Sequence, residues 1–120
     1  MRSLNELNLM GRVGSVKPFG KTAKVSVATD RRRKVNDEWQ SVTEWTEVTI
    51  LKEKTAKWVC ENVGKGDLVF AKARVINGSY EKDGEPVYTV EILAERFVRL
   101  AKKGEEQPDQ LDDDEDDIPF

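Results

Sequence analysis

The arrangement of apolar residues along the first 100 positions constrains the fold more than any other feature of this chain. Apolar residues alternate with polar ones over short segments, and Gly, Pro and charged residues separate the segments. This pattern predicts strands at residues 4–14, 21–29, 39–51, 67–77 and 87–94, with residues 97–100 completing the last one. Residues 15–20 and 78–86 are expected to be loops, and residues 30–38 either a loop or the tip of a long hairpin.

One helix is predicted, at residues 52–63. Ala56, Val59 and Val63 have the spacing of a single buried helix face, and Gly64 follows as a stop signal. Five strands with a helix between the third and the fourth is the order of an OB-fold barrel, and the predicted class is all-β. Periodicity alone supports only a small β-barrel with one helix, so an SH3-like barrel or another small α+β domain stays open at this point.

The content of cysteine and histidine excludes several kinds of chemistry. Cys60 is the only cysteine, so neither an intrachain disulfide nor a zinc site built from cysteines can form, and no histidine can serve as general base or metal ligand. No stretch approaches the roughly 20 apolar residues of a membrane span, and the first ten residues lack the apolar run of a signal peptide. These features predict a cytoplasmic protein with no catalytic site, no metal and no cofactor.

The chain divides into a basic body and an acidic tail. Residues 1–103 hold all 20 Lys and Arg residues and 14 of the 23 acids, a net charge of +6, whereas residues 105–117 hold nine acids and no base. A basic body favours binding of a polyanion, and the tail is expected to compete with that ligand. Residues 1–100 are predicted to be one folded domain, and residues 101–120 a short disordered tail that is too polar to fold alone.

The third and fourth predicted strands carry a candidate binding surface. If Val48 and Ile50 fill the barrel, alternation turns Trp45 outward. On the fourth strand the same alternation predicts three outward residues, Phe70, Lys72 and Arg74. A face that mixes aromatic and basic residues suits single-stranded nucleic acid, because bases stack on rings while cations neutralise phosphates. Alternatively, these aromatic residues cover the barrel or pack against a second subunit.

Further aromatic and basic residues join the candidate nucleic-acid contacts. They are Trp39, Lys24, Tyr80 in its predicted loop, and Arg31, Arg33 and Lys34 in the basic run at residues 31–34. Such a charge run is alternatively an ordinary solvated face. Tyr88 is instead predicted to be a core residue, because it alternates in phase with Val90 and Ile92. Trp58 on the helix is expected in the core or at an interface.

The end of the chain carries a second candidate site. Six consecutive acids precede Ile118, Pro119 and Phe120, and water disfavours two large apolar side chains there unless a pocket receives them. Phe120 can enter an apolar pocket, while its carboxylate and the preceding Asp116 and Asp117 meet basic groups on the partner. These five residues are predicted to bind other proteins; the alternative is a terminus that only improves solubility.

Several segments carry a resemblance to a known family. They are residues 8–14, 25–29, 38–40, 43–45, 64–69 and 88–92 of the body and residues 116–120 at the tip. The chain resembles the bacterial-type single-stranded DNA-binding proteins over nearly its whole length. The resemblance implies an OB-fold domain that binds single-stranded DNA without strong sequence preference, a location with the nucleoid, and a homotetramer, with a dimer as the alternative. It also implies that the tip recruits replication, recombination and repair proteins.

The resemblance also assigns roles to individual residues. Trp45 matches a stacking tryptophan of the family, and Tyr80 falls where the family often has another aromatic residue. Three positions depart from the family pattern: Leu51 stands where a stacking Phe is common, Arg33 where a Trp is frequent, and Thr46 where a His often lies near a subunit interface. The departures at Leu51 and Arg33 imply that the chain relies more on charge and less on stacking, whereas the departure at Thr46 bears on the assembly into a tetramer.

Two other functions are compatible with parts of the sequence. An OB-like assembly protein would act through its tail and an oligomer face, without binding DNA. A metal-dependent nuclease would need its acids to converge, but the acids at residues 112–117 lie in a run predicted to be disordered. DNA binding with partner recruitment is therefore the first hypothesis, and the assembly protein stays open as the second.

Overall fold

The computed structural model of this chain describes residues 1–104. In chain order the elements are β1 (Leu7–Phe19), β2 (Thr22–Val35), β3 (Glu38–Ile50), α1 (Glu53–Asn62), β4 (Leu68–Lys82) and β5 (Glu85–Ala101). The predicted disordered tail lies outside the described residues, except for its first few positions, and so do the tip residues Asp116, Asp117, Ile118, Pro119 and Phe120.

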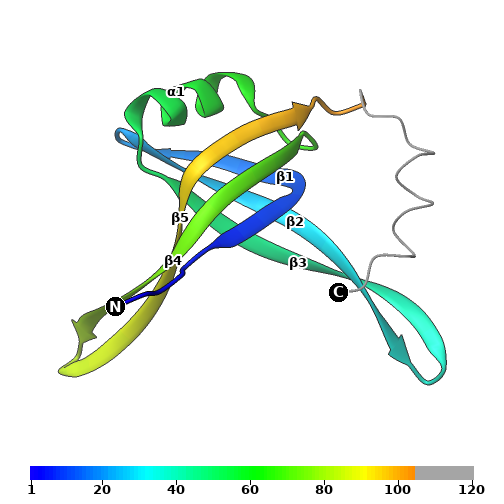
Figure 1. The fold of residues 1–120 in the computed structure, drawn as a ribbon, viewed down its shortest axis with the longest axis horizontal. Coiled ribbons are helices and arrows are strands. Elements are labelled where there is room, and N and C mark those ends of the chain that lie inside the picture. The colour runs from blue at the N-terminus through cyan, green and yellow to red at the C-terminus, as the bar shows by residue number, and fades with distance from the viewer. Residues whose placement is uncertain (105–120) are drawn as a thin grey trace.

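The five strands close into one barrel in the order β1-β2-β3-β5-β4, and β4 returns to pair with β1. Neighbouring strands are antiparallel except β3 and β5, which meet in parallel at Thr49 and Leu93. α1 connects β3 to β4 across one end of the barrel (Figure 1). The topology is therefore the predicted all-β OB-fold, rather than the SH3-like or α+β alternative.

Valine side chains fill much of the barrel. Val25 and Val27 of β2, Val48 of β3 and Val69 of β4 are completely buried. Each contributes about 1.5–3 kcal/mol relative to an exposed side chain. The predicted helix face is confirmed. Ala56 and Val59 of α1 are buried against this core, and so is Val63, which follows the helix directly.

Two hairpins extend beyond the barrel on the side away from α1 (Figure 1). We call them the β2–β3 arm (residues 29–44) and the β4–β5 arm (residues 74–92). Positive φ angles mark their two-residue turns: 51° at Asn36, 64° at Asp37, 54° at Asp83 and 81° at Gly84. Asn, Asp and Gly adopt these angles most readily, which lets the strands pair right up to the turn. Residues 30–38 thus form the hairpin tip, whereas the predicted loop at residues 78–86 is wrong.

Two further predictions are wrong: the position of Tyr88 in the core, and the loop at residues 15–20. Tyr88 and Val90 are 79% and 67% exposed, although both alternate in phase with core residues. They lie in the β4–β5 arm, beyond the last pairing of β1 with β4 at Ala73, and are therefore outside the barrel. The predicted loop at residues 15–20 is mostly strand, because β1 continues to Phe19 before the chain turns.

Asp67 joins three segments at the end of the barrel next to α1. Its carboxylate accepts hydrogen bonds from the backbone N–H groups of Gly64 (3.0 Å) and Lys103 (2.9 Å), and a guanidinium nitrogen of Arg99 lies 3.7 Å away. Burial raises the pKa of Asp67, but the two hydrogen bonds and the positive charges of Arg99 and Lys102 outweigh it, so the pKa lies below its ordinary value. The carboxylate thus connects the residues at and just after the end of β5 with the loop after α1.

Candidate nucleic-acid interface

The outer surface of the β2–β3 hairpin brings several predicted contacts together. Residues directly opposite one another in an antiparallel pair share a face. Trp39 is paired with Lys34, Trp45 is paired with Ala28, and Lys24 lies on the same side further along β2. The two indoles are 61% and 62% exposed and are open to a ligand. We call the surface that carries Lys24, Lys34, Trp39 and Trp45 the aromatic–basic face.

Trp45 rests on two small residues. Ala28 is its direct partner on β2, and Gly14 of β1 lies against its six-membered ring, where an added Cβ would be 2.9 Å from Cη2 of the indole. The register of β1 shifts between Val13 and Ser15, as expected for a bulge at Gly14. The absence of a side chain at Gly14 therefore leaves room for the indole.

The tip of the β2–β3 arm presents the second exposed indole. The guanidinium carbon of Arg32 lies 5.6 Å from the centre of the Trp39 ring, within the range of a cation–π contact. The ammonium group of Lys34 lies 3.9 Å from a carboxylate oxygen of Asp37. Strand geometry separates Trp39 from Trp45 by about 20 Å, six residues at about 3.3 Å each. Arg32 was not among the predicted contacts, because only the strand register places it beside Trp39.

The basic run at residues 31–34 is divided between two faces of the arm. Arg32 and Lys34 share the aromatic–basic face, whereas Arg31 and Arg33 point to the opposite face. On that opposite face Arg31 forms an ion pair with Glu44. The structure therefore does not bring Arg31 and Arg33 together with the exposed indoles.

The predicted residues of β4 lie on an adjoining part of the same sheet. Phe70 is half-buried beside its partner Met10, and the exposed Lys72 lies directly opposite Arg96 of β5. Arg74 is also exposed, as alternation predicts. A row of paired residues connects this surface with the aromatic–basic face: Trp45, Ala28, Arg12 and Leu68. Three strand spacings of about 4.8 Å separate β3 from β4 along this row, so the two surfaces are about 14 Å apart.

Tyr80 lies on the β4–β5 arm rather than in a loop. It pairs with Val87 and is 54% exposed. The two arms project in different directions from the barrel (Figure 1), so Tyr80 is not beside Trp39. Of the positions that depart from the family pattern, Leu51 is 55% exposed just beyond β3, whereas Thr46 is half-buried opposite Val27.

The turn between β1 and β2 carries an aromatic residue that sequence reasoning missed. Phe19 is 55% exposed, and Nζ of Lys24 lies 4.9 Å from the centre of its ring. The same ammonium group lies 3.8 Å from a carboxylate oxygen of Glu47. A Phe between Pro18 and Gly20 has the sequence context of a turn, and only the strand register shows that it lies beside Lys24.

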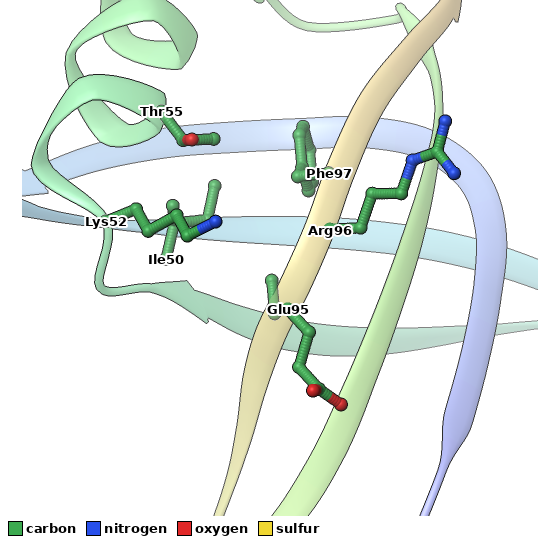
Figure 2. A pocket seen from close by; sticks show the side chains of 7 residues that line it. Ile50, Lys52, Thr55, Glu95, Arg96 and Phe97 are labelled. Carbon is green, nitrogen blue, oxygen red and sulfur yellow. The ribbon is translucent and has the colours of Figure 1, made fainter.

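A small hollow lies between α1 and β5, away from these residues. It has a volume of about 150 Å³, and Ile50, Lys52, Thr55 and Phe97 are among the residues that line it. Phe97 turns toward the helix, whereas Arg96 turns away from it (Figure 2). The hollow therefore lies where the helix packs on the barrel, and the charged residues Lys52, Glu95 and Arg96 are among those that line it.

A wider hollow of about 450 Å³ along the same helix contains Trp58. The guanidinium carbon of Arg99 lies 5.4 Å from the ring centre of Trp58, which is 42% exposed and thus only partly in the core. Within residues 1–104, no three His, Cys, Asp or Glu side chains gather where they could hold a metal ion. The helix in this part of the chain is too short and too polar to cross a membrane.

The structure combines an OB-fold barrel, two projecting arms and an outer face of tryptophans and cations, and such a face suits single-stranded nucleic acid. The sequence model of one such family, described as the single-strand binding protein family, matches residues 4–100. This chain belongs to the single-strand binding protein family.

Known proteins from several organisms are similar to this chain. The mitochondrial single-stranded DNA-binding protein RIM1 of Saccharomyces cerevisiae is 27% identical over 111 residues, which cover 88% of this chain and 78% of the yeast protein. The structure of the Plasmodium falciparum SSB complex with ssDNA is similar in fold, with a TM-score of 0.69 and 22% identity over 83% of this chain and 97% of that one. A crystal structure of yeast Rim1 gives a TM-score of 0.62 and 24% identity, over 83% and 98% of the two chains.

Proposed function

We propose that this protein binds single-stranded DNA without strong sequence preference, through the aromatic–basic face. The observation that carries the proposal is the pair of exposed indoles, Trp39 and Trp45, on one face of a hairpin that also presents Lys24 and Lys34. Every base has a π-face, so stacking on an indole holds any sequence, whereas a base inside a duplex cannot offer its face. Family membership and the fold shared with the Plasmodium complex support the same ligand.

Electrostatics favour the same ligand. Residues 1–103 carry a net charge of +6, which attracts a polyanion and makes the affinity depend on salt. We propose that Phe70, Lys72 and Arg74 extend the contact onto β4, since they lie on the adjoining sheet surface. The remaining predicted contacts lie elsewhere: Tyr80 is on the β4–β5 arm, and Arg31 and Arg33 are on the far side of the β2–β3 arm. We propose that the DNA reaches them where it leaves this surface.

We further propose that the tip formed by Asp116, Asp117, Ile118, Pro119 and Phe120 recruits replication, recombination and repair proteins to the coated DNA. The chemistry supports this role, because an apolar anchor behind a run of acids fits an apolar pocket with a basic rim. The protein would thereby protect single-stranded DNA in the cytoplasm, in association with the nucleoid. Changing Phe120→Ala should abolish pull-down of such an enzyme while oligo-dT binding stays intact, and unchanged pull-down would remove the docking role from this residue.

Assembly of several copies is part of the proposal. Tyr88 and Val90 expose apolar surface on the β4–β5 arm, and burial of such surface against another copy is favourable. We propose a homotetramer, with a dimer as the alternative. The mass of the protein in solution, measured with and without oligo-dT, distinguishes these assemblies from a monomer.

Titration with oligo-dT tests the binding function directly. Fluorescence of the three tryptophans should be quenched as the strand binds, and the quenching should weaken as salt is added. A duplex of the same length, as a control, should quench much less, because its bases are already stacked on one another. Absence of quenching by oligo-dT at low salt would overturn the proposal and favour the assembly protein without DNA binding.

A further inference from the structure

We propose that a groove between α1 and β5 binds residues 112–120 of the same chain, with Phe120 against Trp58 and the acids beside the cations of the groove. The groove consists of the two hollows along α1, which share Thr55 and Phe97 as lining residues. We call it the α1–β5 groove. The inference goes beyond the proposed function, because it gives the tip a site on its own domain from which a partner enzyme must first displace it.

The wider part of the groove offers an apolar surface to a large side chain. Its volume of about 450 Å³ falls within the range of about 300–1,000 Å³ of sites that receive compact ligands. Trp58 is 42% exposed, and Phe97 and Val98 line the same hollow. Water disfavours the exposed indole as it disfavours Ile118 and Phe120 of the tip. Contact between them therefore removes apolar surface of both from water.

The groove and the segment carry opposite charges. Lys54 and Arg99 line the wider hollow, and none of the described residues that line it is acidic. The narrower hollow is lined by two further cations and one acid. The segment contributes six consecutive acids at residues 112–117, directly before its apolar residues. An apolar anchor next to carboxylates fits an apolar hollow with a basic rim, which is the composition of this groove.

The basic rim is already formed in the absence of a ligand. Arg99 donates a 2.7 Å hydrogen bond to the carbonyl of Asn62 at the end of α1, and its guanidinium carbon lies 5.4 Å from the ring centre of Trp58. Asp67 compensates part of the charge of Arg99 at 3.7 Å. Lys54 is exposed and forms no ion pair with an acid within residues 1–104. Its ammonium group is therefore available to the carboxylates of the segment.

The described part of the chain ends close to the groove. The backbone N–H of Lys103 donates a hydrogen bond to Asp67, and the same carboxylate lies 3.7 Å from Arg99, which lines the groove. Residues 105–111 precede the acids and can span up to about 23 Å, seven residues at about 3.3 Å each. A short tether of this kind gives an effective concentration on the order of millimolar, so even a weak affinity keeps the segment bound.

The groove is separate from the exposed indoles of the aromatic–basic face. Neither Trp39 nor Trp45 lines it, and the β2–β3 arm extends on the side away from α1 (Figure 1). The segment in the groove and a DNA strand on the aromatic–basic face can therefore be bound at the same time. The acids then oppose DNA through their charge alone, without occupying the surface on which the bases stack.

A fluorescent synthetic peptide with the sequence of residues 112–120 tests the groove in the full chain. Phe120→Ala removes the chain's own anchor, so this variant should bind the peptide about threefold or more tightly than the unchanged protein does. Adding Trp58→Leu or Lys54→Glu to Phe120→Ala should weaken peptide binding by about fivefold or more. The matched control is Lys82→Glu in the same background. It makes the same charge change on the β4–β5 arm and should alter binding by less than about twofold.

Several outcomes would overturn the inference. One is that the peptide does not bind Phe120→Ala at low salt, and another is that the two groove variants bind it as well as the Lys82→Glu control does. Equal binding by Phe120→Ala and the unchanged protein would overturn docking within one chain. Circular dichroism establishes that each variant is folded.

Saturating oligo-dT gives a second readout, measured by polarisation of the labelled peptide. The peptide should stay bound to Phe120→Ala, whereas its displacement would place the segment on the aromatic–basic face and overturn the inference. Failure of the proposed function is recognised separately. Quenching of the tryptophans by oligo-dT and pull-down of enzymes by the tip are both measured without the peptide.

Discussion

The indole of Trp45 on β3 occupies the space that a side chain at Gly14 on β1 would need. Even a methyl group there would push the ring away from the barrel. We therefore expect Gly14→Ala to weaken oligo-dT binding by up to about 1–3 kcal/mol, the range measured for the loss of one base stack.

The control for this change is Gly64→Ala, since an added Cβ at Gly64 has nothing within 4 Å. Affinity should be unaffected by Gly64→Ala, and circular dichroism should show that both variants are folded. If Gly14→Ala binds oligo-dT as well as the control does, the position of the Trp45 ring is not important for binding.

Trp45 and Trp58 are expected to differ in their importance for DNA. Trp45 lies on the aromatic–basic face, whereas Trp58 lies on α1 with Arg99 against its ring. Trp45→Ala should cost about 1–3 kcal/mol of binding free energy, and Trp58→Ala should cost much less. Fluorescence polarisation of a labelled oligo-dT measures both, and the reverse order would refute the assignment of the face.

Glu47 is expected to oppose DNA binding. Its carboxylate lies 3.8 Å from Lys24 on the aromatic–basic face, so a phosphate that binds there must displace it. Glu47→Gln should raise the affinity by up to about fivefold, the scale of an exposed ion pair, and steepen the salt dependence by about 0.7. Glu61→Gln on α1 changes the net charge equally and serves as the control; the same gain in both would mean that only net charge matters.

Asp67 is expected to stabilise the folded protein in a pH-dependent way. Its pKa lies below the ordinary 3.8, so its contribution is fully present above about pH 4 and is lost as the pH falls through the folded-state pKa. At pH 7 we expect Asp67→Asn to lower the free energy of unfolding by about 1–3 kcal/mol. In urea titrations this difference should shrink below pH 4, whereas a constant difference would assign the effect to packing rather than charge.

Removing the acidic tail is expected to leave or increase DNA affinity. Deletion of residues 112–120 removes six consecutive acidic residues, which would compete with DNA phosphates for the basic body. The comparison is an oligo-dT titration of the full chain and the shortened chain at low and moderate salt. A marked loss of affinity after deletion would show that the tail contributes to folding or to binding.

The sequence predicted the barrel well because its core follows simple alternation. Val48, Ile50 and Val69 are buried where the pattern places them, and the helix lies between β3 and β4 as expected. The arms were harder to predict, because alternation does not reveal where a strand leaves the barrel. Tyr88 has the same phase as core residues, yet its position in a two-stranded ribbon exposes it.

Parts of the candidate site also depend on information that one strand does not contain. The outward direction of Trp45 follows from alternation alone, and the structure agrees with it. The contacts of Arg32 with Trp39 and of Lys24 with Phe19 depend on which residues two different strands place opposite each other. For the same reason the run at residues 31–34 looked like one cluster, although the arm turns its members to opposite sides.

The β2–β3 arm also bears on how this protein avoids aggregation. β1 pairs with β2 only as far as Ala28, so beyond that point the outer edge of β2 has no strand beside it in the described part of the chain. An unpaired edge can accept a strand from another molecule, and charged side chains along it prevent such edge-to-edge addition. The edge carries four consecutive cations at residues 31–34, so two copies repel each other there. Neutralising these residues would remove the proposed DNA contacts and expose the arm to amyloid-like pairing at the same time.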